Sequence, residues 1–287
     1  MRRTLLALGL TILAAGAEAR GDGFNVSVDV PNINDCSDFR ITTDGQRLPV
    51  VSQDVPVSGT VRIASVEHGG IYVRGGASRT TVTACKASRS AGASDVRVTQ
   101  SNGSITADGP DGDNWTVFFL VRTARGAALD LETRNGPITL RDVEARVTAR
   151  AINGPIALRD SSGTIDLETT NGPISITGGS GDVKARAQNG PLAVNLSTGS
   201  WIGSLEGSTE NGPLSLKLAD NYRSGVVVEA RGHSPVVCKV EGCPEAKGRY
   251  QYDEVERFRP RRFELGNGPA NVHLSTNNGP VVVKALD

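Results

Sequence analysis

The sequence predicts an all-β protein, a single-chain parallel β-solenoid (β-helix) with coils of about 18 to 22 residues and two short strands in each coil. Three observations support this fold class: a repeated tripeptide, an alternation of large apolar residues beside each copy, and the composition. The 287 residues include 34 glycines and only 4% aromatic residues, and no long stretch has the apolar period of a helix.

The tripeptide Asn-Gly-Pro recurs at short and regular intervals. Its first three intervals are 18 residues long and the fourth is 22 residues long. Segments that begin at Asn102 and His233 are predicted to be degenerate copies, the latter because it lies a further 22 residues beyond Asn211. Complete copies begin at Asn135, Asn153, Asn171, Asn189, Asn211, Asn267 and Asn278.

Large apolar residues alternate with small or polar residues on both sides of each copy. The segment Ile156–Leu158 follows one tripeptide, and the segment Val147–Ala149 precedes it. This period of two places the large side chains on one face of each strand. Two strands in each coil are therefore predicted to enclose a thin core, and only several stacked coils can cover their apolar faces and strand edges.

Each Asn-Gly-Pro is predicted to form a tight corner, because Asn and Gly tolerate a positive φ and Pro fixes the next φ for entry into a strand. Stacked corners would bring the amide side chains into a hydrogen-bonded ladder. The ladder is predicted to be structural, and the alternative is a row of amides presented to a ligand. Its members are Asn135, Asn153, Asn171, Asn189 and Asn211.

The 18-residue spacing also aligns outward-facing side chains of successive coils. One such row alternates in charge, which favours a fixed register on a solvated face. A second row contains small side chains and is either plain sheet exterior or a docking stripe. The charged row is Glu132, Arg150, Glu168 and Arg186, and the small row is Thr139, Ala157, Ser175, Ala193 and Ser215.

The chain begins with the order of regions found in a secretory signal: Arg2 and Arg3, an apolar run, and a small-residue site that predicts cleavage after Ala19. Residues 20–60 lack the repeat and are predicted to be an N-terminal β segment that caps the solenoid domain of residues 61–287. No later apolar run approaches the roughly 20 residues of a membrane helix. The protein is therefore predicted to be exported, either periplasmic or secreted to the cell surface, and not to be an integral membrane protein.

Export favours disulfides over metal thiolates. Sequence proximity pairs Cys36 with Cys85 and Cys238 with Cys243, although four cysteines allow three pairings. Zinc is the alternative, and it is disfavoured because these cysteines lack the paired short spacings of zinc sites. A calcium-binding nonapeptide is matched only once, at residues 178–183, so neither a metal nor a cofactor is predicted.

Three features of the sequence resemble bacterial adhesin-type domains of unknown function. These are the Asn-Gly-Pro-Ile/Leu-x-Leu units, Gly70–Val73 together with Thr81–Ala84, and the closing segment Leu274–Val283. The resemblance extends from about Val61 to Val283 and implies a β-solenoid in an exported or envelope protein. It implies no site residue, and neither residues 20–60 nor an insert at residues 244–264 follows the pattern.

The insert at residues 244–264 is rich in arginine and aromatic residues, the types enriched at binding hot spots. It is predicted either to bind a ligand or to cap the open end of the solenoid. The candidate binding residues are Tyr250, Tyr252, Arg257, Phe258, Arg259, Arg261, Arg262 and Phe263.

The sequence favours a non-enzymatic, exported adhesin-like or envelope scaffold protein. It does not identify the partner, and the candidate classes are a cell-envelope polymer and another envelope protein. The alternative is a module that binds a glycan or an anionic polymer through the insert. A third hypothesis is a polysaccharide-active enzyme, for which Asp142 and Asp160 are the best carboxylate pair, although each follows an arginine that offers it a corner salt bridge.

No serine-hydrolase elbow, phosphate loop or zinc-protease motif occurs. The balance of 31 basic and 31 acidic residues gives no reason to expect nucleic-acid binding.

Overall fold

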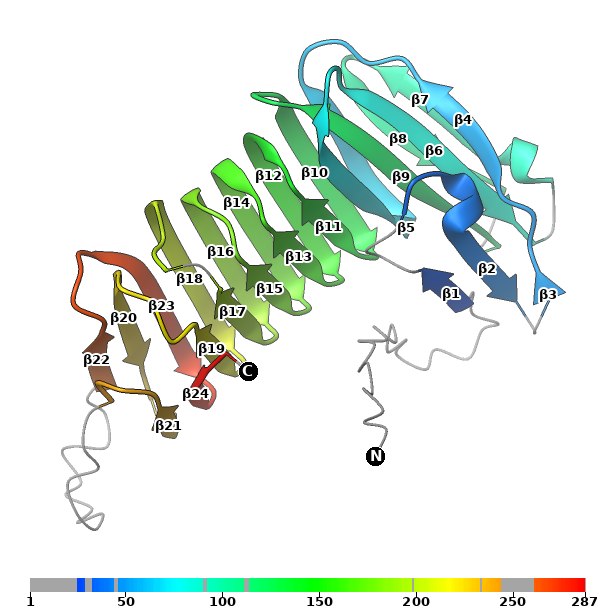
Figure 1. Ribbon diagram of the computed structural model, residues 1–287. Coiled ribbons are helices and arrows are strands. Elements are labelled where there is room, and N and C mark those ends of the chain that lie inside the picture. The colour runs from blue at the N-terminus through cyan, green and yellow to red at the C-terminus, as the bar shows by residue number, and fades with distance from the viewer. Residues whose placement is uncertain are drawn as a thin grey trace, which may run out of the picture.

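The protein is all-β, and its strands form a large and mostly parallel sheet (Figure 1). The computed structural model describes residues 25–28, 33–43, 46–89, 92–110, 114–197, 199–232, 234–243 and 261–286. Within these ranges, 21 strands form one hydrogen-bonded sheet, and three strands form a separate antiparallel sheet. The same ranges contain no helix that is long and apolar enough to cross a membrane.

Each repeat adds one long and one short strand to the large sheet. In the first repeats a residue pairs in parallel with the residue 18 positions on, as Leu131 pairs with Ala149 and Ile138 with Ile156. The next offset is 22, as Leu192 pairs with Leu214. Long strands pair with long strands and short with short, which gives two layers (Figure 1). The long-strand layer contains β10 (Ala128–Asn135), β12 (Glu144–Asn153), β14 (Ser162–Asn171), β16 (Gly181–Asn189) and β18 (Gly203–Asn211), and the short-strand layer contains β11 (Ile138–Arg141), β13 (Ile156–Arg159), β15 (Ile174–Thr177), β17 (Leu192–Leu196) and β19 (Leu214–Leu218).

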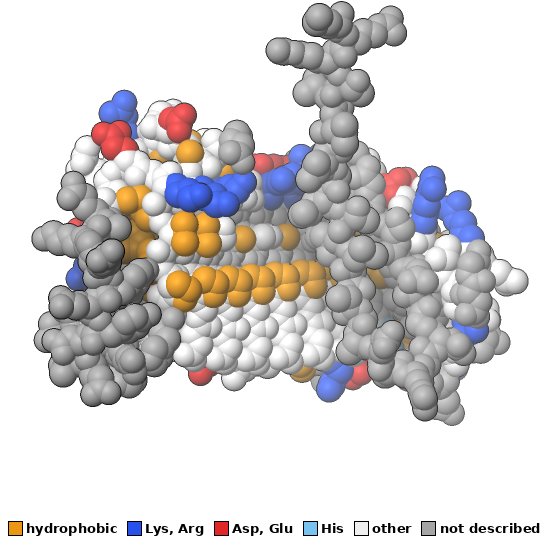
Figure 2. Space-filling model, turned by 90° about the horizontal axis from the view of Figure 1, so that it is seen from below, with side chains coloured by type: hydrophobic (Ala, Val, Ile, Leu, Met, Phe, Trp, Pro, Cys, Tyr) orange, Lys and Arg blue, Asp and Glu red, His pale blue; other side chains and the backbone are white. Residues whose placement is uncertain are grey.

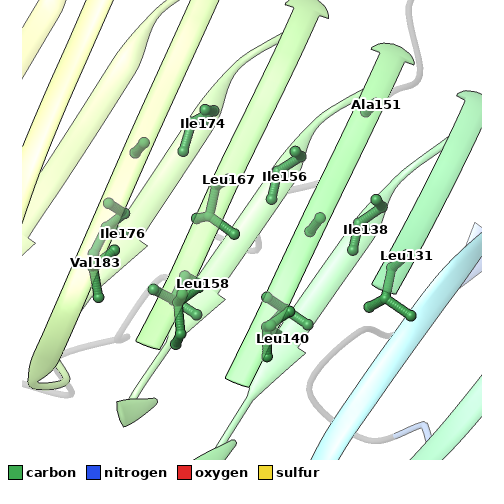
Figure 3. Close-up of a cluster of buried hydrophobic side chains, with 14 of the residues drawn as sticks. Leu131, Ile138, Leu140, Ala151, Ile156, Leu158, Leu167, Ile174, Ile176 and Val183 are labelled. Atoms are coloured by element: carbon green, nitrogen blue, oxygen red, sulfur yellow. The ribbon is translucent and has the colours of Figure 1, made fainter. Parts of the chain in front are cut away.

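The core lies between these two layers, because apolar side chains alternate with polar ones along the repeat strands. Leu131 and Leu167 of the long-strand layer and Ile138 and Leu140 of the short-strand layer are fully buried in one cluster (Figure 3). Burial of each Leu or Ile contributes about 1.5–3 kcal/mol relative to exposure. A single repeat buries few such residues, so its stability depends on the repeats stacked on either side.

The C-terminal strands are inserted into the stack out of chain order. β23 (Ala270–Asn278) and β24 (Val281–Ala285) lie between β18 and β19 on one side and β20 (Gly225–Ala230) and β21 (Val236–Lys239) on the other (Figure 1). The segment at His233 is a degenerate copy, as predicted, because Val236 pairs in register with Val281. It does not lie beside the Asn211 repeat, since β24 occupies that place, and His233 itself lies outside the described residues.

The last corner of the stack carries a serine in place of the glycine. A Cβ added at Gly279 would lie only 2.1 Å from the carbonyl oxygen of Gly212. Pro235 and Pro280 occupy equivalent positions, since Val236 pairs with Val281. Ser234 therefore takes the glycine position in the repeat next to Gly279, and its hydroxyl oxygen accepts a hydrogen bond from the backbone nitrogen of Gly279 at 3.2 Å.

The first repeats are also out of chain order. β5 (Val61–Ala77) passes through both layers and pairs with β10 and β11, and it carries His68 at the position of the corner asparagine. On its other side it pairs with β8 (Ser104–Asp108) in the long-strand layer and β9 (Trp115–Ala124) in the short-strand layer.

The segment at Asn102 is a hairpin turn and not a degenerate corner, contrary to the sequence prediction. Asn102 and Gly103 have φ of 52° and 77° and connect β7 (Arg97–Ser101) to its antiparallel partner β8. Ile105 then pairs with Ile63 in the long-strand layer, whereas the residue after a corner enters the short-strand layer. Asn-Gly is a strong hairpin signal because both residues accept a positive φ.

The repeated corners themselves contain no positive φ, so the predicted reason for their Asn and Gly is wrong. The glycines are required by the close approach of successive corners. A Cβ added at Gly154 would lie 2.1 Å from the carbonyl oxygen of Gly136, and one at Gly172 would lie 2.2 Å from that of Gly154. A side chain at either position would push adjacent repeats apart.

Antiparallel strands flank the parallel stack. At the N-terminal end β6 (Thr81–Ser88) pairs with β9, and β4 (Val51–Val55) pairs with β6. The 3-10 turn η3 (Ala93–Asp95) precedes β7, and at the other end β22 (Arg261–Leu265) pairs with β20. These strands occupy edges that would otherwise be available for pairing with another chain.

An N-terminal segment packs on the outer face of the short-strand layer. Phe39 stacks on Phe118 with ring centroids 4.8 Å apart and contacts Tyr72 edge-on at 5.6 Å. Burial raises the pKa of the Tyr72 hydroxyl, and a disulfide between Cys36 and Cys85 joins the segment to β6. The segment comprises β1 (Asn25–Val28), η2 (Cys36–Asp38), β2 (Phe39–Thr43) and β3 (Gln46–Arg47).

We expect Gly172→Ala to destabilise the protein by about 2 kcal/mol, because the new methyl group would overlap the Gly154 carbonyl of the neighbouring corner. Gly199→Ala is the matched control, since its Cβ would find its nearest atom at 3.5 Å. Thermal unfolding of the two variants checks this. Equal melting temperatures would contradict the role assigned to the corner glycines.

Replacing both Cys36 and Cys85 by Ala is expected to destabilise the protein by about 2–4 kcal/mol, because this disulfide closes a long loop between residues 49 apart in the sequence. The Cys238 and Cys243 bridge joins residues only 5 apart, so the corresponding double variant should lose less. Denaturant unfolding measures both losses, and the reverse order would contradict this expectation.

Candidate binding surface

Most of the predicted binding residues of the insert lie outside the described part of the chain. These are Tyr250, Tyr252, Arg257, Phe258 and Arg259. Arg261, Arg262 and Phe263 are described, and they begin β22 at the end of the long-strand layer.

The described end of the insert is a capping strand. Arg262 forms ion pairs with Glu264 at 3.0 Å and with Glu229 of β20 at 3.8 Å. Phe263 is only 9% exposed and packs in the core, so its side chain is not available at the surface. Arg261 pairs through its backbone with Ala230.

All four cysteines form disulfides. Cys36 pairs with Cys85 at a Cα–Cα distance of 5.2 Å, and Cys238 pairs with Cys243 at 5.7 Å. The first bridge joins the N-terminal segment to β6, and the second joins Cys238 of β21 to the turn that follows this strand. Disulfides are typical of proteins outside the reducing cytoplasm.

The corner asparagines form a continuous ladder of side-chain hydrogen bonds. The amide nitrogen of Asn171 donates to the amide oxygen of Asn153 at 2.9 Å, and its own oxygen accepts from Asn189 at 3.1 Å. The ladder has an additional member, Asn278, which donates to Asn211 at 3.0 Å. The bonds that complete it join Asn153 to Asn135 and Asn211 to Asn189, each at 3.0 Å.

Threonines beneath the ladder donate hydrogen bonds to the carbonyl oxygens of corner glycines, and the sequence analysis missed them. The buried Thr169 donates to the carbonyl oxygen of Gly154 at 3.1 Å, and the buried Thr276 donates to that of Gly212 at 3.0 Å. The signal that identifies them is a threonine two residues before the corner asparagine. These hydrogen bonds join adjacent repeats inside the corner.

The outer face of the long-strand layer carries interleaved charges. The row of Glu132, Arg150, Glu168 and Arg186 is in register across β10, β12, β14 and β16. Arg150 lies 3.8 Å from both Glu168 and Asp130, and Arg186 lies 3.4 Å from Asp166. Each exposed pair is worth less than about 1 kcal/mol, so together they mainly fix the register.

A shallow hollow of about 290 Å³ opens on the same face toward its C-terminal end. Cationic side chains of β16 form part of its lining, and carboxylates of β18 and β20 form another part. Its charged and titratable lining residues are Lys184, Arg186, Glu206, Glu229 and His273.

Asp142 and Asp160 share a turn on the side of the short strands opposite the asparagines. Both have a positive φ, 54° and 46°, and Gly178 takes the same position in the next repeat with φ of 64°. Asp and Gly are tolerated in this left-handed conformation. Asp142 also lies 3.4 Å from Arg141. Turn geometry therefore accounts for the recurrence of these carboxylates.

No group of three or more His, Cys, Asp or Glu side chains in the described ranges is arranged to hold a metal ion.

The outer face of the short-strand layer is flat. Its central row holds the small side chains of Thr139, Ala157, Ser175, Ala193 and Ser215, which are paired in register across five neighbouring strands. Figure 2 shows this side of the molecule, with straight rows of hydrophobic side chains and a group of Lys and Arg side chains beside them.

Neither a family model nor a curated protein matches this sequence. Two solved structures overlap with 83% of the chain each. One is a "putative cell adhesion protein" from Clostridium sporogenes, with 8% identity, a TM-score of 0.30 and all of its own chain covered. The other is a "putative adhesin" from Bacteroides fragilis, with 11% identity, a TM-score of 0.39 and 97% of its own chain covered. At these TM-scores neither structure assigns a site to this chain.

We expect Asn171→Ala to destabilise the protein by about 1–2 kcal/mol, because it removes two hydrogen bonds from the interior of the ladder. Asn278→Ala removes only one of the ladder bonds and should cost less. Differential scanning calorimetry measures both. If neither variant lowered the melting temperature, the ladder would not be structural.

Proposed function

We propose that the protein is a non-enzymatic, exported interaction protein of the cell envelope, in which a two-layered β-solenoid presents flat outer faces to an envelope partner. The observation that carries this proposal is the register of the repeats. Equivalent residues of successive repeats are paired strand by strand, so the outer side chains form long straight rows. Such rows suit an extended partner that contacts many repeats at once.

Three further features support this proposal. Two disulfides and the signal-like N-terminus favour an exported protein. The antiparallel strands that flank the stack limit edge-to-edge pairing between copies and leave the broad faces for contact. The carboxylates considered for catalysis, Asp142 and Asp160, have a turn role that explains their spacing.

Binding through the insert is less well supported than binding through a face of the solenoid. Arg262 is engaged by two glutamates and Phe263 is buried in the core. Both therefore contribute to a cap, which is the second role that the sequence suggested for this segment.

The test is sedimentation of purified residues 20–287 with bacterial cell-envelope fractions. A matched variant replaces residues 244–260 with a Gly-Ser linker of equal length, which retains the capping strand β22. We expect both proteins to co-sediment with the envelope, because the flat faces are intact in both. Loss of binding in the linker variant would assign the interaction to the insert, and no binding by either protein would contradict the proposed function.

A further inference from the structure

A second row lies beside the row of small side chains on the short-strand layer. Each successive strand contributes one residue, and pairing registers align them along the stack. All but two of these residues are basic and none is acidic. The row is Arg122, Arg74, Arg141, Arg159, Thr177, Asn195, Lys217, Lys284 and Lys239.

This like-charge row differs from the charged rows of the other layer. There, Arg150 is flanked in register by Glu132 and Glu168, so neighbouring charges attract. In the short-strand layer Lys284 is flanked in register by Lys217 and Lys239. Like charges directly opposite one another across strands are destabilising. The fold therefore tolerates a repulsion here that the same repeats avoid on the opposite face.

The two ends of the basic row differ in their surroundings. Arg122 and Arg74 donate hydrogen bonds to Asn34, so they help to hold the N-terminal segment. Arg141 lies beside Asp142. At the other end Lys239 and Lys284 are exposed, and neither forms an ion pair or hydrogen bond with any described residue.

The floor beside the three lysines is flat and partly apolar. Ser215, Val282 and Val237 continue the row of small side chains in register, and Val237 is 44% exposed. Neighbouring strands lie about 4.8 Å apart, so the three lysines form a straight line with one cation at each strand. Figure 2 shows Lys and Arg side chains grouped along this face, next to the rows of hydrophobic side chains.

We propose that this lysine row, Lys217, Lys284 and Lys239, binds a linear acidic polysaccharide whose carboxylates recur along its length. The chain lies parallel to the stack axis, its carboxylates contact successive ammonium groups, and its sugar rings rest on Ser215, Val282 and Val237. This inference rests on the proposed function and names its surface and its partner. It involves no covalent step.

The shape of the row favours a polysaccharide over other polyanions. A membrane surface would suit a broad basic area, whereas these cations form a single line with a flat and partly apolar strip beside it. Single-stranded nucleic acid is held by aromatic side chains that stack on its bases, and none lies in this part of the two rows. A linear sugar polymer with regularly spaced carboxylates matches both the charge and the straightness of the site.

The test measures binding of polygalacturonate, which has one carboxylate on each sugar, to the protein of residues 20–287 by isothermal titration calorimetry. We expect replacement of Lys217, Lys284 and Lys239 by Gln to weaken binding roughly tenfold, since each exposed ionic contact contributes modestly. The corresponding triple replacement by Arg should retain binding, because it conserves the charge. Binding should also weaken as salt is raised, because exposed charges are screened over about 8 Å at physiological ionic strength.

A control variant changes the net charge by the same amount on the opposite face. It replaces Arg146, Lys184 and Arg186, all exposed on the long-strand layer, by Gln and should bind like the unmodified protein. Equal losses in the two Gln variants would overturn the assignment of the site. So would unchanged binding in the lysine-row variant, or tighter binding of a DNA oligonucleotide or anionic vesicles than of polygalacturonate.

The outcome is separable from that of the envelope test. A protein that co-sediments with envelope fractions but does not bind polygalacturonate retains the proposed function and contradicts this inference. Melting temperatures of all variants identify any loss that comes from unfolding, and the Arg variant repeats the test with the charge retained.

Discussion

The fold depends on how closely successive corners can approach. The carbonyl oxygen of each corner glycine occupies the space where the next corner would carry a Cβ, as Gly136 does for Gly154. This approach allows the parallel strands to pair in register, and it also brings the asparagine amides within 2.9 to 3.1 Å of one another. The ladder, the straight rows and the continuous core all follow from a corner that has no side chain at its closest point.

Local patterns predicted much of this arrangement. The period of two identified the buried residues of the repeats, such as Ile138 and Leu140, and the 18-residue interval identified which residues pair. The same patterns could not predict the order of the stack at its ends. The segments at His233 and Asn278 each precede a proline and a short strand, and these patterns do not distinguish which one lies beside the Asn211 repeat.

The lysine row also could not be predicted from the sequence, because it depends on the order of the strands in the stack. Glu132, Arg150 and Glu168 are equally spaced along the chain, so their alignment is visible as a sequence period. Lys217, Lys239 and Lys284 are unequally spaced, and only the inserted position of β24 brings them into one row. Sequence analysis instead favoured the insert, because a local cluster of arginine and aromatic residues is visible without knowledge of the stack.

The lysine row depends on the position of the C-terminal strands in the stack. β19, β24 and β21 each contribute one lysine, and β24 contributes the middle one. Because β24 lies between β19 and β21, Lys217 and Lys239 are neighbours of Lys284 and not of each other. The strands that bring the three lysines into one row also bury Val281 and Val283 and add Asn278 to the ladder. Apolar burial of about 1.5–3 kcal/mol for each large side chain exceeds the cost of exposed like charges. The fold can therefore hold this row of cations, and an anionic partner would reduce the repulsion among them.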